Sequence, residues 1–270
     1  MPSQFTHSWT EKEIEFVRAN IGKLTYNKMG NLINRSYNSI QSKVRYLPFN
    51  KKVKKHPVNS GFFKKWSPEM AYVLGFIAAD GNICHSGKAF TLHVASDDID
   101  VIQKIRTVIQ YLGPIHKKPR LNGKISYSLR ICDPIIFKDL EKLGITERKS
   151  LTLSPKVSPI FIIDFLRGFF DGDGSVYIRN HKYPSKLAAI FYTASCPMAK
   201  FVHFNMRRLL GNLYGGEIRK QISKKGNPYY SIGLGHKASA KLYSIFYTNA
   251  TIYMDRKFKK FLQGIKHDNP

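Results

Sequence analysis

Apolar residues recur at intervals of three to four positions between residues 8 and 47, a spacing that predicts three short helices. Residues 8–11 fit a capping box at the start of the first helix. Asn34-Arg35 makes the turn before the third helix, which Ser36 or Ser39 can cap. The apolar positions are Trp9, Ile14, Phe16, Val17, Tyr26, Met29, Leu32, Ile33, Ile40, Val44 and Leu47. We therefore expect a small three-helix bundle over residues 1–50.

The third of these helices carries side chains that can hydrogen-bond base edges or phosphates. They are Asn38, Ser39, Gln41, Ser42, Lys43 and Arg45. The segment resembles a Myb/SANT-like helix-turn-helix, with Trp9 in the position of that family's first core tryptophan. The resemblance implies a DNA-binding domain, in which Ser39, Gln41, Lys43 and Arg45 are expected to contact DNA. A three-helix bundle used for protein contacts is the alternative.

Residues 48–66 combine two prolines and a glycine with six lysines. This composition predicts an extended basic linker over residues 51–66 that lies along DNA when bound. The expected contacts come from Lys51, Lys52, Lys54 and Lys55. A linker without contacts is the alternative.

From residue 67 onward the chain repeats itself. Residues 70–82 are echoed by residues 163–175, and further pairs recur in the same order: Ala95-Ser96 with Ala194-Ser195, Leu112-Gly113 with Leu210-Gly211, and Arg148-Lys149 with Arg256-Lys257. Each copy is predicted to contain an apolar helix, two strands, an amphipathic helix, two more strands and a closing helix. We expect an α+β fold in which residues 67–154 and 155–270 form two pseudo-symmetric repeats of one monomer.

The charge of the chain points to its partner. The formal net charge is +26, with 44 Lys and Arg against 18 Asp and Glu in 270 residues. No acid occurs between Glu15 and Glu69, and Glu217 is the only one between Asp173 and Asp255. A basic surface of this extent favours binding along the phosphate backbone of a nucleic acid. A solvated face that only aids solubility is the weaker interpretation, because acidic residues would serve as well.

Several other classes of protein are disfavoured. The longest near-apolar stretch, residues 70–79, is shorter than the ~20 residues of a membrane-spanning helix, and residues 1–10 show no secretory signal. Cys84, Cys132 and Cys196 lack the paired spacing of a zinc site. No phosphate-loop, dinucleotide, metalloprotease or nucleophile-elbow motif occurs. We expect an intracellular protein that binds nucleic acid and no membrane.

Small residues lie four positions apart in both repeated apolar helices, which predicts that these helices pack closely against each other. These residues are Gly75, Ala79, Gly168 and Gly172. Gly81 and Gly174 follow directly and suit the left-handed position that ends a helix. The helix pair would therefore end in two adjacent carboxylates, Asp80 and Asp173.

Two adjacent carboxylates at the negative ends of helix dipoles repel each other. A divalent cation would remove the repulsion, and oxygen ligands favour Mg²⁺ with phosphate and water completing its shell. We expect Asp80 and Asp173 to hold the metal together with the adjoining Gly81 and Gly174. A turn residue before glycine is the alternative for each aspartate. Asp171 competes for the same role, although its repeat partner, Ala78, cannot bind a metal.

Residues 73–81 and 166–174 resemble the paired motifs of the LAGLIDADG homing endonucleases, and the resemblance covers about residues 67–262. It implies an αββαββα unit used twice, with the motif helices between the halves and two four-stranded antiparallel sheets forming a saddle over the DNA major groove. It also implies a monomeric, site-specific endonuclease of the intron-homing type. Such an enzyme hydrolyses one phosphodiester on each strand of a long, nearly asymmetric duplex site, with Mg²⁺ or another divalent cation such as Mn²⁺ or Ca²⁺. Ala78 departs from the motif's first acid, whereas Asp80 keeps its last one.

The same resemblance places a basic residue near the scissile groups after the closing helix of each half, where Lys149 and Lys257 stand. A lysine there can polarise water or stabilise developing phosphorane charge, and ordinary phosphate contacts are the alternative. Further DNA contacts are expected from strand and hairpin side chains, most of which would position the duplex rather than specify its sequence. The candidates are His85, Lys88, Arg120, Ser128, Arg130, Arg179, Lys182, Lys186, Arg219, Gln221, Lys224, Lys225 and Tyr230.

A binding protein on the same scaffold is the main alternative to a nuclease. It would be an RNA-splicing maturase that binds intron RNA, or a DNA-binding regulator with a dormant site. Retention of both Asp80 and Asp173 favours the nuclease.

Overall fold

The computed structural model describes residues 8–47, 56–87, 89–120, 123–179 and 186–266. The chain divides into two compact units. The first unit comprises Met1–Asn59 with Gln110–Pro114, and the second comprises Ser60–Ile109 with Ile115–Pro270. Within the described residues, none of the helices is long and apolar enough to cross a bilayer.

The first unit contains α1 (Glu11–Asn20), α2 (Tyr26–Ile33) and α3 (Tyr37–Tyr46). Its core consists of Val17, Met29, Ile40 and Val44, four of the positions that the apolar spacing predicted. The capping box lies two residues later than expected, because Thr10 is the residue with extended backbone before α1. The Thr10 hydroxyl accepts from the amide of Glu13, and the Glu13 carboxylate accepts from the amide of Thr10.

The second unit is built from two similar halves. The first half runs through α4 (Pro68–Asp80), β1 (Gly81–Ser86), β2 (Ala89–Ser96), α5 (Ile99–Val108), β3 (His116–Pro119), β4 (Ile125–Cys132) and α6 (Pro134–Lys142). The second half runs through α7 (Ile162–Asp173), β5 (Ser175–Arg179), β6 (Lys186–Thr193), α8 (Cys196–Leu210), β7 (Ile218–Ile222), β8 (Pro228–Leu234), α9 (His236–Tyr247) and α10 (Asp255–Lys266). Short 3₁₀ turns lie at Phe62–Lys64, Lys149–Leu151, Pro159–Phe161 and Gly211–Leu213. The halves differ after the closing helix, where the second half continues into α10 and the first forms only the turn Lys149–Leu151.

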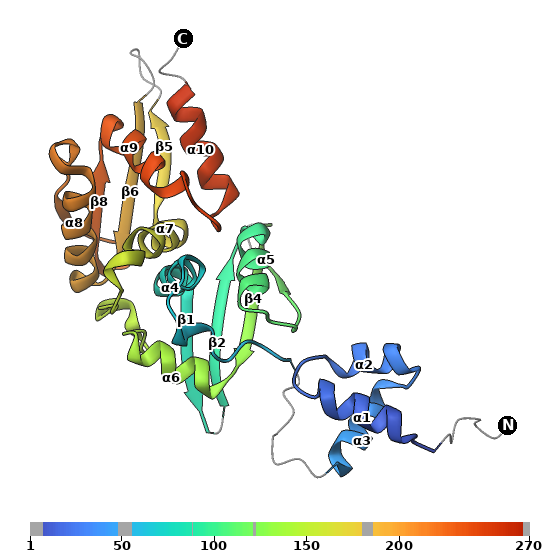
Figure 1. Cartoon of the computed structure of the whole chain (residues 1–270). Coiled ribbons are helices and arrows are strands. Elements are labelled where there is room, and N and C mark those ends of the chain that lie inside the picture. The colour runs from blue at the N-terminus through green and yellow to red at the C-terminus, as the bar shows by residue number, and fades with distance from the viewer. Residues whose placement is uncertain (1–7, 48–55, 88, 121–122, 180–185, 267–270) are drawn as a thin grey trace. The chain divides into compact units, whose positions relative to one another are not determined.

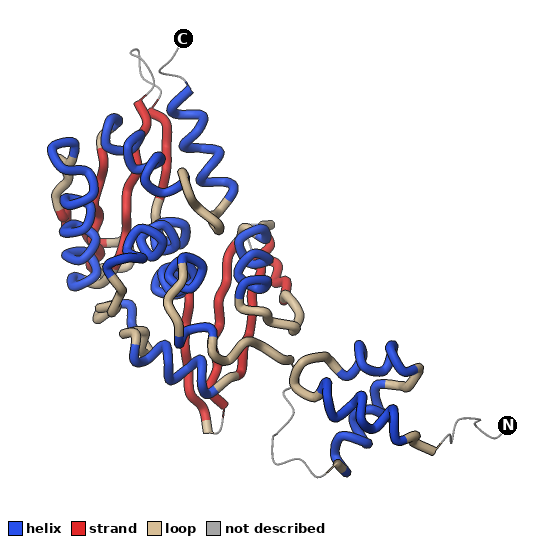
Figure 2. The backbone as a smooth tube through the Cα atoms, in the orientation of Figure 1, coloured by secondary structure: helices blue, strands red, loops and turns tan. Residues whose placement is uncertain are grey.

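Each half contains one four-stranded antiparallel sheet, with strand orders β1-β2-β4-β3 and β5-β6-β8-β7. Figures 1 and 2 show α4 and α7 side by side, with one sheet on either side of them. The predicted α+β fold, with two repeats and a preceding three-helix bundle, is confirmed. Two sheets that flank a helix pair are consistent with the predicted saddle.

Alternation along the strands gives each sheet one covered and one more open face. In the first sheet, Val94 pairs with Leu129 and both are buried against helices. In the second, Phe191 pairs with Ile232 in the same way. The helices α5 and α6 contact the first sheet, and α8, α9 and α10 contact the second. Polar and half-exposed side chains occupy the opposite faces.

Candidate functional site

The crossing of α4 and α7 depends on residues without side chains. A Cβ atom on Gly75 would overlap the carbonyl oxygen of Phe165, and one on Gly168 would overlap that of Tyr72. Nearer the helix ends, a Cβ on Gly172 would overlap the methyl group of Ala79. The structure thus brings the four small residues of the sequence pattern into one interface. Their contacts are reciprocal between the halves, as a pseudo-twofold axis requires.

Both helices end at their last aspartate. The following Gly81 and Gly174 have φ angles of −89° and −83°, so the backbone there is extended and the expected left-handed conformation is absent. Glycine is required for a different reason, which is close approach. A Cβ on Gly81 would lie 2.7 Å from the Ile77 carbonyl oxygen, and one on Gly174 would lie 2.5 Å from that of Phe170.

The pKa values of Asp80 and Asp173 are both raised. Asp173 is half-buried, and its pKa rises to about 7 because of burial first and the charge of Asp80 second. The Asp80 side chain remains exposed, yet neighbouring protein atoms displace enough water to raise its pKa too. Within the described residues, neither carboxylate has a hydrogen bond or an ion pair with another side chain. Two acids in this state are poorly stabilised as anions by the protein alone.

Lys149 and Lys257 bind the ends of the two motif helices. They are only 7% and 4% exposed. The Lys149 ammonium donates to the carbonyl of Gly81 at 2.7 Å, and that of Lys257 donates to Phe170 at 2.6 Å and Asp171 at 2.7 Å. A cation at a helix C-terminus offsets the negative end of its dipole. Burial lowers the pKa of both amines, that of Lys257 to about 8.

The two lysines also act across the halves. Among the charges that stabilise the Lys149 ammonium, Asp173 of the other half comes before Asp80. For Lys257, the charge of Asp171 contributes most, followed by that of Asp80 in the other half and then that of Asp173. A hollow of about 300 Å³ opens beside Asp173 and is lined by Lys149, Tyr192, Thr193 and Tyr229, among others. The structure therefore gathers both aspartates and both lysines of the sequence prediction in one place.

Asp171, the competing acid, lies elsewhere. It is fully buried, and its Oδ2 accepts from the Tyr72 hydroxyl at 2.7 Å and the Met254 amide at 2.8 Å. Burial raises its pKa to about 6. Because its carboxylate points into the protein, a role in packing suits Asp171 better than one in binding metal.

The donor set of Asp80 and Asp173 fits a divalent cation that takes part of its shell from a ligand. Within the described residues, no group of three or more His, Cys, Asp or Glu side chains could hold a metal alone. Mg²⁺ commonly binds one or two carboxylates and completes its shell with phosphate and water. The Gly81 carbonyl accepts from Lys149 and keeps a second lone pair. The two carboxylates would therefore be the charged ligands, and the predicted contribution of Gly81 and Gly174 stays a prediction.

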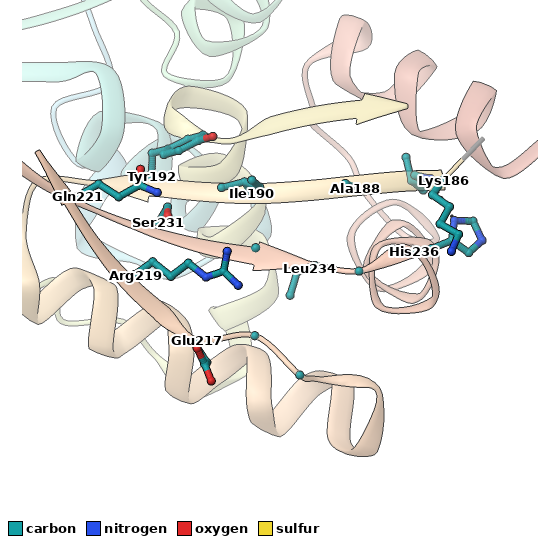
Figure 3. Close-up of a pocket in the computed structure, with 15 residues that line it drawn as sticks. Lys186, Ala188, Ile190, Tyr192, Glu217, Arg219, Gln221, Ser231, Leu234 and His236 are labelled. Atoms are coloured by element: carbon teal, nitrogen blue, oxygen red, sulfur yellow. Dashed lines mark hydrogen bonds between the residues drawn. The ribbon is translucent and has the colours of Figure 1, made fainter. Parts of the chain in front are cut away.

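Strand register decides which of the predicted DNA-contacting residues share the open face of the second sheet. Lys186, Arg219 and Gln221 line a hollow of about 380 Å³ on this face, together with Tyr192 and Ser231 (Figure 3). Tyr230 lies on the other face, because it pairs with the buried Thr193. Lys224 and Lys225 are exposed in the β7–β8 turn.

In the first sheet, Ser128 and Arg130 lie on the open face, where Arg130 pairs with His93. His85 lies on the opposite face and stacks on Phe90, with ring centroids 4.3 Å apart. Arg120 is exposed after β3 and forms an ion pair with Asp97 at 2.9 Å.

In the first unit, Gln41 and Arg45 are exposed on α3. The Lys43 ammonium lies 5.5 Å from the centre of the Trp9 ring. The Ser39 amide donates a hydrogen bond to the Ser36 hydroxyl, which caps the helix. Other predicted contacts lie outside the described residues: Lys51, Lys52, Lys54, Lys55, Lys88, Lys182 and the side chain of Arg179.

Sequence reasoning did not single out several ring-bearing residues of the open faces, among them His93, His116, Tyr177, Tyr192 and Tyr229. A signal was available. In β8, the apolar Ile232 and Leu234 mark the covered face, and counting by two from Ile232 assigns Tyr230 to that face and Tyr229 to the open one.

Comparison with known proteins agrees with this architecture. Residues 161–266 match the family model of the LAGLIDADG-like domain. The structure of the homing endonuclease I-WcaI bound to its DNA recognition sequence is similar, with a TM-score of 0.52 and 16% identity over 81% of this chain and 97% of that one. The LAGLIDADG homing endonuclease I-GzeII in complex with its DNA target has a TM-score of 0.51 and 13% identity over 75% and 89% of the two chains. These structures share the fold of this protein. Among curated proteins, no match was found.

Proposed function

We propose that this chain, which has the fold of LAGLIDADG homing endonucleases and carries a LAGLIDADG-like domain, is a site-specific double-stranded DNA endonuclease. The observation that carries the proposal is the pair of carboxylates at the ends of α4 and α7. Asp80 and Asp173 have raised pKa values and form no hydrogen bond or ion pair with another side chain among the described residues. They belong to a chain with a net charge of +26. This arrangement suits a metal ion shared with a phosphodiester.

In this proposal, Asp80 and Asp173 hold Mg²⁺ or another divalent cation, which would supply a Lewis acid for phosphodiester hydrolysis. The close contact at Gly75 and Gly168 fixes the spacing of the two carboxylates. Lys149 and Lys257 keep positive charge next to them while holding the helix ends in place. Positive charge fixed in advance near a reacting phosphate stabilises the charge that develops there.

The open faces of the two sheets would hold the duplex. Arg219 and Gln221 from β7 and Arg130 from β4 are exposed on these faces. Arginine suits phosphate and guanine, and glutamine suits adenine. Both halves belong to one chain, so a monomer supplies a complete site for an asymmetric DNA target.

Incubation of the protein with Mg²⁺ and a randomised duplex library, followed by sequencing of the ends, tests the proposal. We expect a family of related cut sites. Asp80→Asn and Asp173→Asn should each abolish cleavage while leaving DNA binding intact, because the amide keeps the shape but not the charge. Glu141→Gln, on the exposed side of α6, is the matched control and should cleave like the wild type.

Two results would contradict the proposal. One is cleavage by either asparagine variant at the wild-type rate. The other is intact DNA with Mg²⁺, Mn²⁺ and Ca²⁺ alike, and tight binding to structured RNA under those conditions would then favour the splicing maturase.

A further inference from the structure

Three consecutive residues at the start of α10 are each held by an aspartate. The Met254 amide donates to Asp171 at 2.8 Å, and the Asp255 amide donates to Asp100 at 3.0 Å. The Arg256 guanidinium makes three hydrogen bonds to Asp98, between 2.9 and 3.1 Å. Carboxylates on the first amides of a helix are favourable, because those amides lack partners within the helix. The next residue along the chain is Lys257.

Two of these aspartates belong to the other half of the protein. Asp98 and Asp100 stand at the N-terminal end of α5 in the first half. Lys104 strengthens the link, since its ammonium donates to Asp255 at 2.6 Å and to the carbonyl of Tyr253 at 2.8 Å. The first half therefore forms hydrogen bonds with residues 253–256 of the second half, directly before Lys257.

The position of Lys257 depends on this segment. Its ammonium reaches the carbonyls of Phe170 and Asp171 at the end of α7. Asp171 thus holds the segment twice, through its side chain at Met254 and through its carbonyl at Lys257. A shift at the start of α10 would therefore move the Lys257 ammonium away from Asp80 and Asp173.

The segment before Lys149 is held differently in the described part of the chain, where the Glu147 carboxylate accepts from the His85 amide. Ala78 stands where the repeat would place a counterpart of Asp171, and Pro197 and Ala199 stand where it would place those of Asp98 and Asp100. Lys149 instead begins the short turn Lys149–Leu151, after Arg148 with a φ of 54°. The halves therefore differ at all three of these aspartate positions.

We propose that Asp98, Asp100 and Asp171 are positioning residues that set Lys257 beside the paired aspartates, so that the first half controls a lysine of the second. The part of the inference that concerns cleavage rests on the proposed function. The part that concerns the placement of Lys257 does not.

Brief acetylation with acetic anhydride, read by mass spectrometry at each lysine, tests the placement without DNA. In the wild type, both buried lysines should react slowly. Asp100→Ala removes one part-buried hydrogen bond, from the Asp255 amide, and should raise the rate at Lys257 about tenfold through local opening. Asp171→Ala removes two buried hydrogen bonds, from Tyr72 and Met254, and should raise the rate at Lys257 at least as much. Lys149 should be unchanged. Asp100→Asn should restore protection, since its side-chain oxygen can still accept from the Asp255 amide.

Asp97→Asn is the matched control, because Asp97 neighbours Asp98 but pairs with Arg120 instead of α10. It should leave labelling at Lys257 unchanged. An equal rise at Lys149 and Lys257 would mean general loosening and would overturn the inference, as would no rise at either lysine in both alanine variants.

Plasmid cleavage tests the consequence. With a cloned target site, Asp98→Asn and Asp100→Ala should accumulate nicked circles, in which one defined strand is cut at the wild-type rate and the other strand is cut more slowly. Equal slowing of both strands would overturn the assignment. A wild type that cuts no DNA would instead refute the proposed nuclease, and the labelling result would still decide the placement of Lys257.

Discussion

Gly75 and Gly168 are the two positions at which main-chain atoms of the crossing helices leave no room for a side chain. The obstacle in each case is a carbonyl oxygen of the opposite helix, which cannot move without shifting that helix. Backbone contact of this kind makes the spacing of Asp80 and Asp173 a property of the interface, rather than of the aspartates themselves.

We predict that Gly75→Ala or Gly168→Ala lowers the free energy of unfolding by about 2–3 kcal/mol, because an added methyl group forces the helices apart. Urea denaturation followed by circular dichroism measures the change. Gly215→Ala is the control, since a Cβ there meets no atom within 4 Å, and it should stay within about 0.5 kcal/mol of the wild type. Equal effects at all three glycines would contradict the contact.

Glu13 joins α1 to Arg35, whose guanidinium donates to its carboxylate at 2.9 and 3.0 Å. This hydrogen-bonded pair lowers the pKa of Glu13 to about 2. A depressed carboxylate pKa stabilises the folded state above the unfolded value of about 4.3, and the gain is lost as the pH falls towards 2. The first unit should therefore weaken between about pH 5 and pH 2.

Trp9 reports on this unit, because Arg35 and Lys43 lie over its ring. Its fluorescence in a Trp66→Phe background, which removes the only other tryptophan, follows unfolding of the first unit. Glu13→Gln should flatten the pH dependence in that range. An unchanged slope would show that other groups carry it.

At the scale of elements, the sequence predicted the helices and the repeated strand pattern, but it did not assign the face of every strand side chain. Tyr230 and His85 were expected to contact DNA, and both lie on the covered faces of their sheets. The ends of the motif helices were better predicted, because an Asp-Gly pair after a small-residue stripe is a local signal. Face assignment is harder, since it depends on the partner strand and on the helices that cover the sheet.

Neighbouring residues of β7 test this assignment. Arg219→Ala should weaken binding to the target duplex and reduce the slope of log K against log salt by about 0.9, as loss of one phosphate contact does. Lys220→Ala removes the same charge from the opposite face of the strand and should leave the slope nearly unchanged. Fluorescence anisotropy across a salt series measures both. Equal slopes for the two variants would contradict the proposed DNA-facing side.

Arg167 connects α7 with the end of α9 and the loop that follows. It is 2% exposed, and it donates to Asp164 at 2.6 Å and to the carbonyls of Phe246 and Ile252 at 3.0 Å. Arg167→Met should lower the free energy of unfolding by about 3–5 kcal/mol, because it leaves buried acceptors unpaired. Lys142→Ala removes an exposed lysine whose ammonium lies 3.6 Å from Asp139, and it should cost less than about 1 kcal/mol. Thermal and urea denaturation compare the two variants.

At the scale of the whole molecule, internal repetition predicted two equivalent halves, whereas the differences between them could not be predicted. The helix α10 and the aspartates that anchor it depend on contacts between residues about 80 to 160 positions apart in the chain. Sequence periodicity contains no information on such pairs. Two halves that differ in this way could each bind a different half of a duplex target that lacks strict symmetry.

The first unit adds a further surface, and α3 presents it. Asn38, Gln41, Ser42 and Arg45 are all exposed and recur at the spacing of one helix face. If this face and the saddle bind one duplex, Gln41→Ala with Arg45→Ala in the full chain should shorten the DNase footprint at one end only. Lys12→Ala, an exposed change on α1, should leave the footprint intact. Because Asp80 and Asp173 lie in the other unit, the cut position should not move. An undiminished footprint in the double variant would show that α3 does not contact the target, and a footprint shortened at both ends would point to weaker binding by the saddle itself.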